Sequence, residues 1–224
     1  MFDDLKNTID FFICSKTKFS RKNFVEKNPK ILSQIERENL YLKDILEKTF
    51  EKKNLEFANI LDIGSKNWYY AKAQYNFFKS FCNDFLLTGV ELDAYRLYSN
   101  FYSRFEVAKY YTKGLEKTKY LAKNLLEINQ KQDYIIWILP FVSINPLRFW
   151  GLPEKFFMTE KLLTHAFNLL KDNGQMLIIN QGEKEKDLQR QLLEKLNISF
   201  VFLGEIESEY YKYQNKRFGF LIKK

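Results

Sequence analysis

The sequence contains little of the material from which metal centres, disulfide frameworks and membrane spans are built. Its two cysteines, Cys14 and Cys82, are too few for a disulfide framework, and its one histidine, His165, excludes a multi-histidine metal site. No apolar run approaches the ~20 residues of a membrane-spanning helix. No basic region precedes an apolar patch at the N-terminus, so we expect no secretion signal. We expect a cytoplasmic protein that does not bind a membrane.

Glycine and proline are also scarce, with 8 and 4 residues in a chain of 224. No Pro/Gly-rich linker, internal repeat or low-complexity tract divides the sequence. Apolar residues make up 46% of the chain and aromatic residues 17%, which is enough for a sizeable core and excludes a disordered or fibrous protein. The net charge of +8 is weak evidence for an anionic partner.

Residues 1–57 are predicted to form a helical extension packed on the main domain, which we place at 58–224. A short amphipathic stretch covers residues 5–13. Asn28 before Pro29 signals a helix start, because asparagine caps the first amides and proline suits the first helical position. Apolar residues then recur at helical spacing, at Ile31, Ile35, Leu42, Ile45, Leu46 and Phe50.

From residue 59 onward, apolar strands alternate with amphipathic helices. We predict strands over 59–63, 85–91, 120–123, 134–139, 175–180, 198–206 and 217–222, the last two paired antiparallel. We predict helices over 68–80, 159–170 and 183–196, and one with Leu97, Phe101, Phe105 and Ala108 on a single face. The helix over 159–170 is expected to end in a turn at 171–174 with Gly174 in the left-handed position.

This alternation predicts an α/β fold. Near-continuous apolar strands require a parallel sheet that helices cover on both faces. Ligands of such sheets bind beyond the carboxyl ends of the strands, where the strand order reverses. The ends of the first four strands are therefore expected to surround one crevice.

Three polar positions mark this crevice. Asp62 and Gly64 close the first strand, where glycine permits a tight turn and the approach of a ligand, and the carboxylate accepts from an amine or hydroxyl. Glu91 ends the second strand and is placed to accept both hydroxyls of a ribose; a solvated strand-end acid is the alternative. Asn124 follows the third strand, where its amide suits an adenine edge or simply a turn.

The fourth strand ends at Leu139 and leads into an aromatic, proline-bearing loop over residues 146–157. This loop either covers a pocket or stacks on a planar substrate, or else fills the core at the sheet edge. His165 lies mid-helix and is expected to pack or face solvent rather than act as a general base. Glu183 is expected to be a first-turn acid of the next helix rather than a base. Cys82 lies away from the strand ends, so we assign it no nucleophilic role.

Four segments together resemble class I S-adenosylmethionine-dependent methyltransferases. They are residues 60–64 (ILDIG), 88–93 (TGVELD), 133–137 (DYIIW) and 169–179 (LLKDNGQMLII), of which the last is the most discriminating. The resemblance covers the chain from residue 59 to its end. It implies a Rossmann-like, doubly wound, mostly parallel sheet of seven strands with the last strand antiparallel, and S-adenosylmethionine as cofactor.

Carried over residue by residue, the resemblance assigns cofactor contacts to this chain. The methionine end would lie at Asp62, Gly64 and Ser65, the ribose at Glu91 and the adenine at Asn124. The full set of cofactor-binding residues is Asp62, Gly64, Ser65, Glu91, Leu92, Asn124 and Leu139. No catalytic residue and no metal site is assigned.

Two features depart from the family pattern. First, Lys66 and Trp68 occupy positions at which the family has further glycines. Second, the residues Leu139, Pro140 and Phe141 at the end of the fourth strand lack a polar side chain. Methyltransferases that act on the amino groups of nucleic-acid bases use such a side chain to hold the amine.

Three functions follow, the first being methyl transfer to an unidentified small molecule or RNA. The second is an RNA-modifying form that uses basic residues over 16–30 together with Lys109, Lys113, Lys117, Lys119 and Lys123. The third is a non-catalytic binding module. A nicotinamide-dependent oxidoreductase is disfavoured, because Gly64 has no partner glycines to cradle a pyrophosphate.

Overall fold

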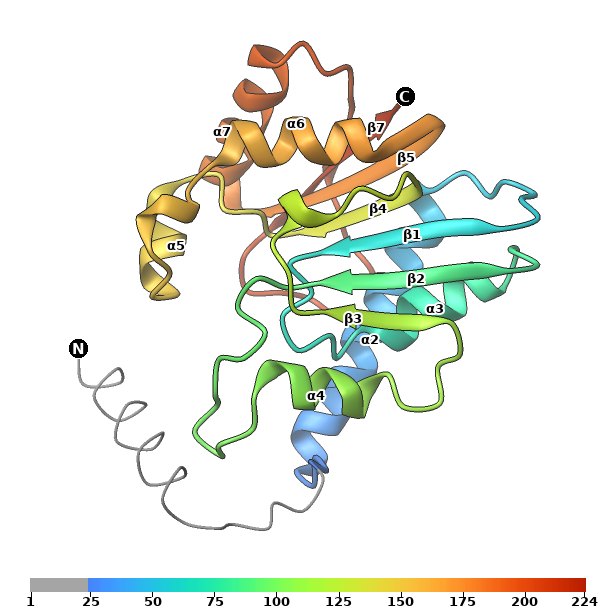
Figure 1. Cartoon of the computed structure of the whole chain (residues 1–224), viewed down its shortest axis with the longest axis vertical. Helices are drawn as coiled ribbons and strands as arrows, with labels where there is room; N and C mark the ends of the chain where they lie inside the picture. The colour runs from blue at the N-terminus through green and yellow to red at the C-terminus, as the bar shows by residue number, and fades with distance from the viewer. Residues whose placement is uncertain (1–23) are drawn as a thin grey trace.

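The computed structural model describes residues 24–224, so the stretch predicted over 5–13 lies outside the described residues. Within them, seven strands form one sheet in the order β3-β2-β1-β4-β5-β7-β6 (Figure 1). Strands β1 to β5 run parallel, and β7 pairs antiparallel with both β5 and β6. The strands are β1 (Ala58–Ile63), β2 (Phe85–Val90), β3 (Thr118–Leu121), β4 (Gln132–Ile138), β5 (Leu170–Gln181), β6 (Val201–Glu205) and β7 (Arg217–Lys223). The predicted Rossmann-like sheet with an antiparallel last strand is confirmed.

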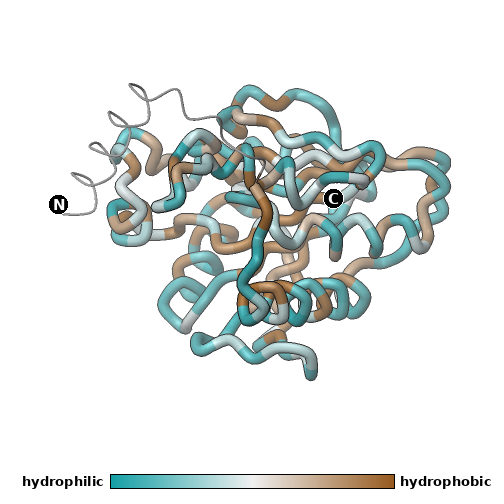
Figure 2. Tube along the Cα trace, turned by 90° about the horizontal axis from the view of Figure 1, so that it is seen from below, coloured by the Kyte–Doolittle hydropathy of each residue, from teal (hydrophilic) through white to brown (hydrophobic). Residues whose placement is uncertain are grey.

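Helices cover both faces of this sheet. One face packs against α2 (Pro29–Thr49), α3 (Ala71–Lys79) and α4 (Arg104–Tyr111), and the other against α6 (Thr159–Leu169) and α7 (Gly182–Lys195). Consecutive strand residues such as Ile60 and Leu61 belong to opposite cores, because side chains alternate between the faces. Figure 2 shows the hydrophobic segments gathered toward the middle of the molecule. The short helices α5 (Ile144–Phe149), η1 (Leu125–Glu127) and η2 (Glu154–Phe156) complete the described elements.

The predicted N-terminal helix is present as α2. The side chain of Asn28 accepts a hydrogen bond from the Lys30 amide at 3.0 Å, and Pro29 opens the helix. Leu42, Ile45 and Leu46 are buried in the core that α2 shares with α3. The boundary at residue 57 between an extension and a main domain stays a prediction.

Two local predictions are wrong. The helix expected to carry Leu97 and Phe101 begins only at Arg104, because Ser103 and Glu106 form a reciprocal capping box at its start. Gly174 does not take the left-handed position; Asn173 does, with φ 64°. Glycine is needed at 174 for space, since an added Cβ would lie 2.9 Å from the Lys171 carbonyl oxygen.

The side chain of Trp68, just after β1, packs against Gly89 of β2. Trp68 is fully buried, and its indole N–H donates to Gln74 Oε1 at 2.9 Å. Opposite it, a Cβ added to Gly89 of β2 would lie 2.9 Å from two indole carbons and 2.7 Å from Ser65 Oγ. The indole is therefore accommodated because β2 has no side chain at this point, and Trp68 belongs to the core rather than to the strand-end crevice.

We predict that Gly89→Ala lowers the free energy of unfolding by about 1–3 kcal/mol, because the new methyl group overpacks against the indole. Urea denaturation measures this cost. In the background of Trp68→Leu the same substitution should cost clearly less, since the two positions are in contact. An equal cost in both backgrounds would mean that the indole is not the obstacle.

Candidate functional site

The loop after β1 has a left-handed backbone at every second residue. Gly64 has φ 71°, Lys66 has φ 53° and Trp68 has φ 48°. Glycine adopts this conformation freely, whereas each of the two other residues is disfavoured there by about 1 kcal/mol or more. The positions at which the resemblance leads one to expect glycines thus keep a backbone suited to glycine, with bulky side chains on it.

Hydrogen bonds to β2, to the residue that follows it and to β3 hold the loop in this shape. The Gly64 amide donates to the Val90 carbonyl at 2.9 Å, and the Lys66 amide donates to Glu91 Oε2 at 2.8 Å. The Tyr120 hydroxyl, on β3, donates to the Lys66 carbonyl. A strained backbone persists where its surroundings over-determine it, and these bonds meet that condition.

Glu91 stands directly after β2, where its carboxylate is almost completely buried. One oxygen accepts from the Lys66 amide, and the other accepts from the Asp93 amide at 2.8 Å. Arg104 places a guanidinium nitrogen 3.7 Å from the second oxygen and 3.3 Å from Asp93. An ionised carboxylate has about four acceptor sites, so Glu91 keeps capacity for a ligand after these contacts.

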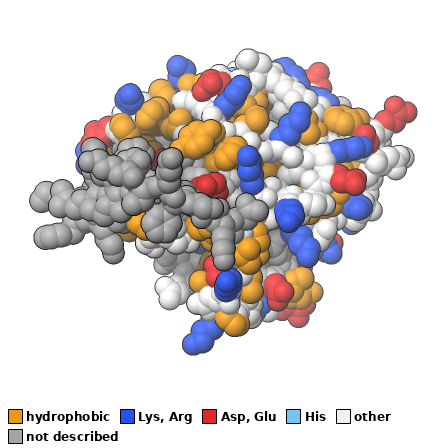
Figure 3. Space-filling model, turned by 60° about the horizontal axis from the view of Figure 1, so that its bottom comes forward, with side chains coloured by type: hydrophobic (Ala, Val, Ile, Leu, Met, Phe, Trp, Pro, Cys, Tyr) orange, Lys and Arg blue, Asp and Glu red, His pale blue; other side chains and the backbone are white. Residues whose placement is uncertain are grey.

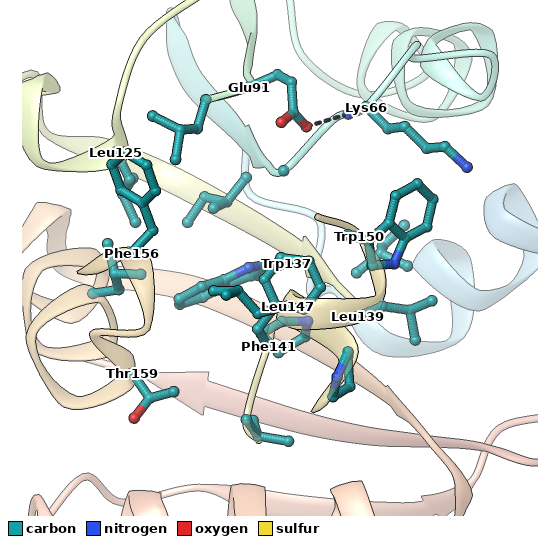
Figure 4. Close-up of a pocket in the computed structure, with 18 of the residues that line it drawn as sticks. Lys66, Glu91, Leu125, Trp137, Leu139, Phe141, Leu147, Trp150, Phe156 and Thr159 are labelled. Atoms are coloured by element: carbon teal, nitrogen blue, oxygen red, sulfur yellow. Dashed lines mark hydrogen bonds between the residues drawn. The ribbon is translucent and has the colours of Figure 1, made fainter. Parts of the chain in front are cut away.

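A cavity of about 340 Å³ opens at the carboxyl ends of the strands. This volume falls within the ~300–1,000 Å³ of small-molecule sites. Figure 4 shows Glu91 and Lys66 on one side of it and an apolar wall that includes Trp137, Phe141 and Phe156. The cavity continues past β4 to Gln181 at the end of β5 and to Glu185 and Gln189 of α7.

The structure brings most of the predicted residues to this cavity, but not all. Those that line it are Gly64, Glu91, Leu92, Asn124 and Leu139. Asp62 and Ser65 do not line it: both are fully buried behind the loop, where Ser65 Oγ donates to the Asp62 carbonyl at 2.9 Å. Their assignment to the methionine end of the cofactor stays a prediction; in this structure the Asp62 carboxyl accepts from Tyr70 and Gln74, and Ser65 bonds to the Asp62 backbone.

Asn124 uses part of its side chain for structure. Its amide oxygen accepts from the Leu126 amide at 3.0 Å and caps η1, while its backbone amide donates to Glu127. The side-chain amide nitrogen of Asn124 has no hydrogen-bond partner among residues 24–224. Asn124 can therefore be a turn residue and still donate to an adenine.

The loop over residues 146–157 covers the cavity. Trp150 lies with its ring 4.6 Å from Lys66 Nζ and 5.1 Å from the Arg104 guanidinium carbon, so two cations face one indole. Leu147 and Phe156 of the same segment line the cavity as well. Phe149, by contrast, is 89% exposed. The loop is thus a wall of the site rather than filler of the main core.

Leu139 turns the chain at the end of β4. It has φ 56°, although it is not a glycine and precedes a proline, and its amide donates to the Ile179 carbonyl at 2.7 Å. After this strained residue, Pro140 and Phe141 form part of the cavity wall. The strained residues Lys66, Trp68 and Leu139 therefore follow the ends of two neighbouring parallel strands, β1 and β4.

Other predicted residues lie outside the cavity. His165 Nε2 lies 2.9 Å from the Ile128 carbonyl oxygen, which confirms the packing role. Glu183 is in the first turn of α7, as predicted, and pairs with Lys186. Cys82 is buried, which raises the pKa of its thiol to about 11.

Sequence reasoning missed several residues that line the cavity: Tyr69, Tyr70, Arg104, Glu185 and Gln189. Arg104 directly follows the Ser103–Glu106 capping signal, which the sequence does contain. Gln189 is 1% exposed, and its Nε2 has no partner among the described residues. No local sequence pattern identifies Tyr69, Tyr70 or Glu185 as cavity residues.

Three solved structures are similar to this chain in fold. A methyltransferase dependent on S-adenosylmethionine from Aquifex aeolicus superposes with a TM-score of 0.59 at 14% identity, over 88% of this chain and 99% of that chain. Magnesium protoporphyrin IX methyltransferase from Synechocystis, with bound S-adenosylhomocysteine, gives 0.55 at 10% identity over 99% and 97%. The N-methyltransferase NodS from Bradyrhizobium japonicum gives 0.51 at 13% identity over 89% and 98%.

The chain has the class I methyltransferase fold. No protein-family model and no curated protein matches its sequence. In the described part of this methyltransferase-like chain, no group of three or more His, Cys, Asp or Glu side chains is arranged to hold a metal ion. None of the helices described here is both long and apolar enough to cross a bilayer.

Asp62 predicts a pH dependence of stability. Its carboxyl accepts from Gln74 Nε2 at 2.8 Å and from the Tyr70 hydroxyl at 3.1 Å, yet complete burial raises its pKa from 3.8 to about 7. The native state thus retains this proton to higher pH than the unfolded state does. The contribution of Asp62 to stability is fully present below about pH 4 and is lost as the pH rises to about 7.

We therefore predict that Asp62→Asn, which cannot ionise, becomes more stable relative to the natural protein as the pH rises from 4 to 8. Urea denaturation at several pH values measures the difference. If this difference stays constant over the range, Asp62 does not carry a proton in the native state.

Proposed function

We propose that the protein binds S-adenosylmethionine in the strand-end cavity and transfers its methyl group to a small acceptor. The observation that carries this proposal is the placement of Glu91, whose buried carboxylate lines the cavity with acceptor capacity to spare. Gly64 lines the same wall, and a Cβ built there would meet nothing within 4 Å. The solved relatives of this fold, one of them with bound S-adenosylhomocysteine, agree with the choice of cofactor.

The residues at the cavity fit an adenosyl ligand. Glu91 would accept from the ribose hydroxyls, and the Asn124 amide nitrogen would donate to the adenine. Leu92 and Leu125 offer apolar contact for the flat base beside them. Arg104 lies 3.7 Å from the Glu91 carboxylate and supplies the opposite charge that a buried carboxylate needs.

When bound, S-adenosylmethionine supplies an electrophilic methyl group on a sulfonium. An acceptor lone pair would form the new bond to carbon while the carbon–sulfur electron pair returns to sulfur, and a neutral acceptor releases its proton to water. The task of this chain is then to orient the acceptor and exclude bulk water. The wall formed by Trp137, Phe141 and Trp150 suits that task.

The largely apolar lining of the cavity favours a small acceptor over RNA. Of the basic residues that motivate an RNA-modifying enzyme, Lys117 pairs with Asp84 and Lys109 lies over the Phe105 ring. On the face in Figure 3, outside the grey atoms, lysine and arginine side chains are interspersed with acidic and apolar ones.

The alternative is a binding module without catalysis. The Lys66 side chain supports this alternative, because it lines the cavity at a position where the family has a glycine. A cytoplasmic location is part of the proposal.

We predict that Glu91→Gln weakens binding of S-adenosylhomocysteine at least tenfold, because a charged acceptor of hydrogen bonds is lost. Isothermal titration calorimetry measures the affinity. The exposed Glu116→Gln serves as the control and should bind like the natural protein.

Thermal melting of each variant checks that the loop remains folded. Equal affinity of the natural protein and Glu91→Gln would remove the ribose assignment. No binding by the natural protein at millimolar cofactor, with measurable binding by Lys66→Gly, would favour the module that has lost its ligand.

A further inference from the structure

The part of the strand-end cavity beside α7 contains polar side chains that the proposed cofactor contacts do not use. Glu185 and Gln189 line the cavity there, one helical turn apart on the same face of α7. Glu91 follows β2, and three strand spacings separate β2 from β5, which α7 follows. At ~4.8 Å for each spacing, the ends of β2 and β5 are about 14 Å apart. A ribose bound at Glu91 therefore does not reach these two side chains.

Gln189 is a buried donor that lacks an acceptor. The residue is 1% exposed, and its Nε2 has no hydrogen-bond partner among residues 24–224. Leu193, one turn further along α7, packs into the core between the sheet and α6, so Gln189 is on the inner face of the helix. A buried polar group without a partner destabilises the fold. The Nε2 group therefore needs an acceptor that the described chain does not supply.

Glu185 offers the complementary acceptor. It is half-buried, and one of its carboxylate oxygens accepts from the Gln181 amide at 3.1 Å. Within the described part of the chain, no lysine or arginine forms an ion pair with it. Burial raises the pKa of this carboxyl, although the Gln181 amide and Arg217 act in the opposite direction. The second carboxylate oxygen is available to a donor on a ligand.

The walls around this polar pair are apolar and partly aromatic. Figure 4 shows Trp137 between Glu91 and Thr159, the first residue of α6. The apolar side chains that line this part of the cavity are Trp137, Phe156, Leu162, Leu163 and Leu192. A lining of this kind, with few polar groups, suits an apolar molecule that carries one small polar group.

A neutral hydroxyl is the polar group that satisfies both side chains. It has one donor and two acceptor lone pairs, so a single oxygen can donate to Glu185 and accept from Gln189. An ammonium would pair with Glu185, but it has no lone pair for the Gln189 amide. A carboxylate would accept from Gln189, but the Glu185 charge would repel it.

We propose that this part of the cavity binds the hydroxyl group of an apolar, phenol-like acceptor, which donates to Glu185 and accepts from Gln189. The aromatic side chains Trp137 and Phe156 contact its ring. The proposal rests on the proposed function, because a molecule held here becomes a methyl acceptor only when S-adenosylmethionine occupies the Glu91 side of the cavity.

Calorimetry of the full chain saturated with S-adenosylhomocysteine, with three probes of similar shape, tests the proposal. p-Cresol carries a neutral hydroxyl, 4-methylanisole has the oxygen without the donor, and 4-methylbenzylamine carries an ammonium. p-Cresol should bind at least tenfold more tightly than 4-methylanisole, because only p-cresol donates to the Glu185 carboxylate. It should also bind more tightly than the amine, which cannot accept from Gln189.

Variants of the two side chains separate their roles. Glu185→Gln should reduce the advantage of p-cresol over 4-methylanisole at least threefold, because a charge-assisted hydrogen bond becomes a neutral one. Gln189→Leu should weaken both oxygen probes by about threefold to tenfold, and it should keep or raise the melting temperature, because a buried amide without a partner is removed. The exposed positions Glu194→Gln and Gln191→Leu, on the same helix, are the matched controls and should bind like the natural protein.

Three results on the probes overturn the proposal: no binding of p-cresol at millimolar concentration, equal affinity for p-cresol and 4-methylanisole, or tighter binding of the amine. A lower melting temperature of Gln189→Leu with unchanged probe affinity also overturns it. Gln189 would then support the fold, for instance by pairing with Asn180, which is likewise buried without a partner in the described chain.

Titration of S-adenosylhomocysteine into the natural protein reports on the adenosyl site separately. Its failure contradicts the proposed function, whereas the three probes still test the Glu185 and Gln189 pair in the free protein. Binding of S-adenosylhomocysteine without discrimination among the probes contradicts the further inference alone.

Discussion

The hydrogen bond from the Lys66 amide to the Glu91 carboxylate is the contact on which the rest of the site depends. It joins the loop after β1 to the end of β2 and fixes the carboxylate that faces the cavity. Without glycine at position 66, the loop needs such a bond to remain left-handed. The same constraint that strains the backbone thus positions the group that we propose holds a ribose.

This constraint shows why the fold is predictable and the detail of the loop is not. Apolar runs that end at Gly64 and Glu91 locate two parallel strands, and their junction follows from general rules for such sheets. The left-handed conformation of Lys66 and Trp68 depends on Tyr120 and Glu91, which are distant in sequence. The missing glycines therefore suggest a damaged site, although the backbone retains the shape.

Burial decides where the residues of the strand-end motif lie relative to the cavity. Asp62 and Ser65 belong to the strand-end motif, but the fully buried Trp68 and Gln74 pack behind them and draw them into the core. Their place depends on the helix α3 that follows, not on the motif itself. Glu185 and Gln189 show the reverse case: no motif marks them, and only the path of α7 brings them to the cavity that Glu91 lines.

A crystal structure of the protein with S-adenosylhomocysteine tests the central claim most directly. The account predicts both ribose hydroxyls within hydrogen-bond distance of Glu91, the adenine beside Asn124, and a loop still left-handed at residues 66 and 68. A ligand bound elsewhere, or a Glu91 carboxylate turned away from it, would contradict the account.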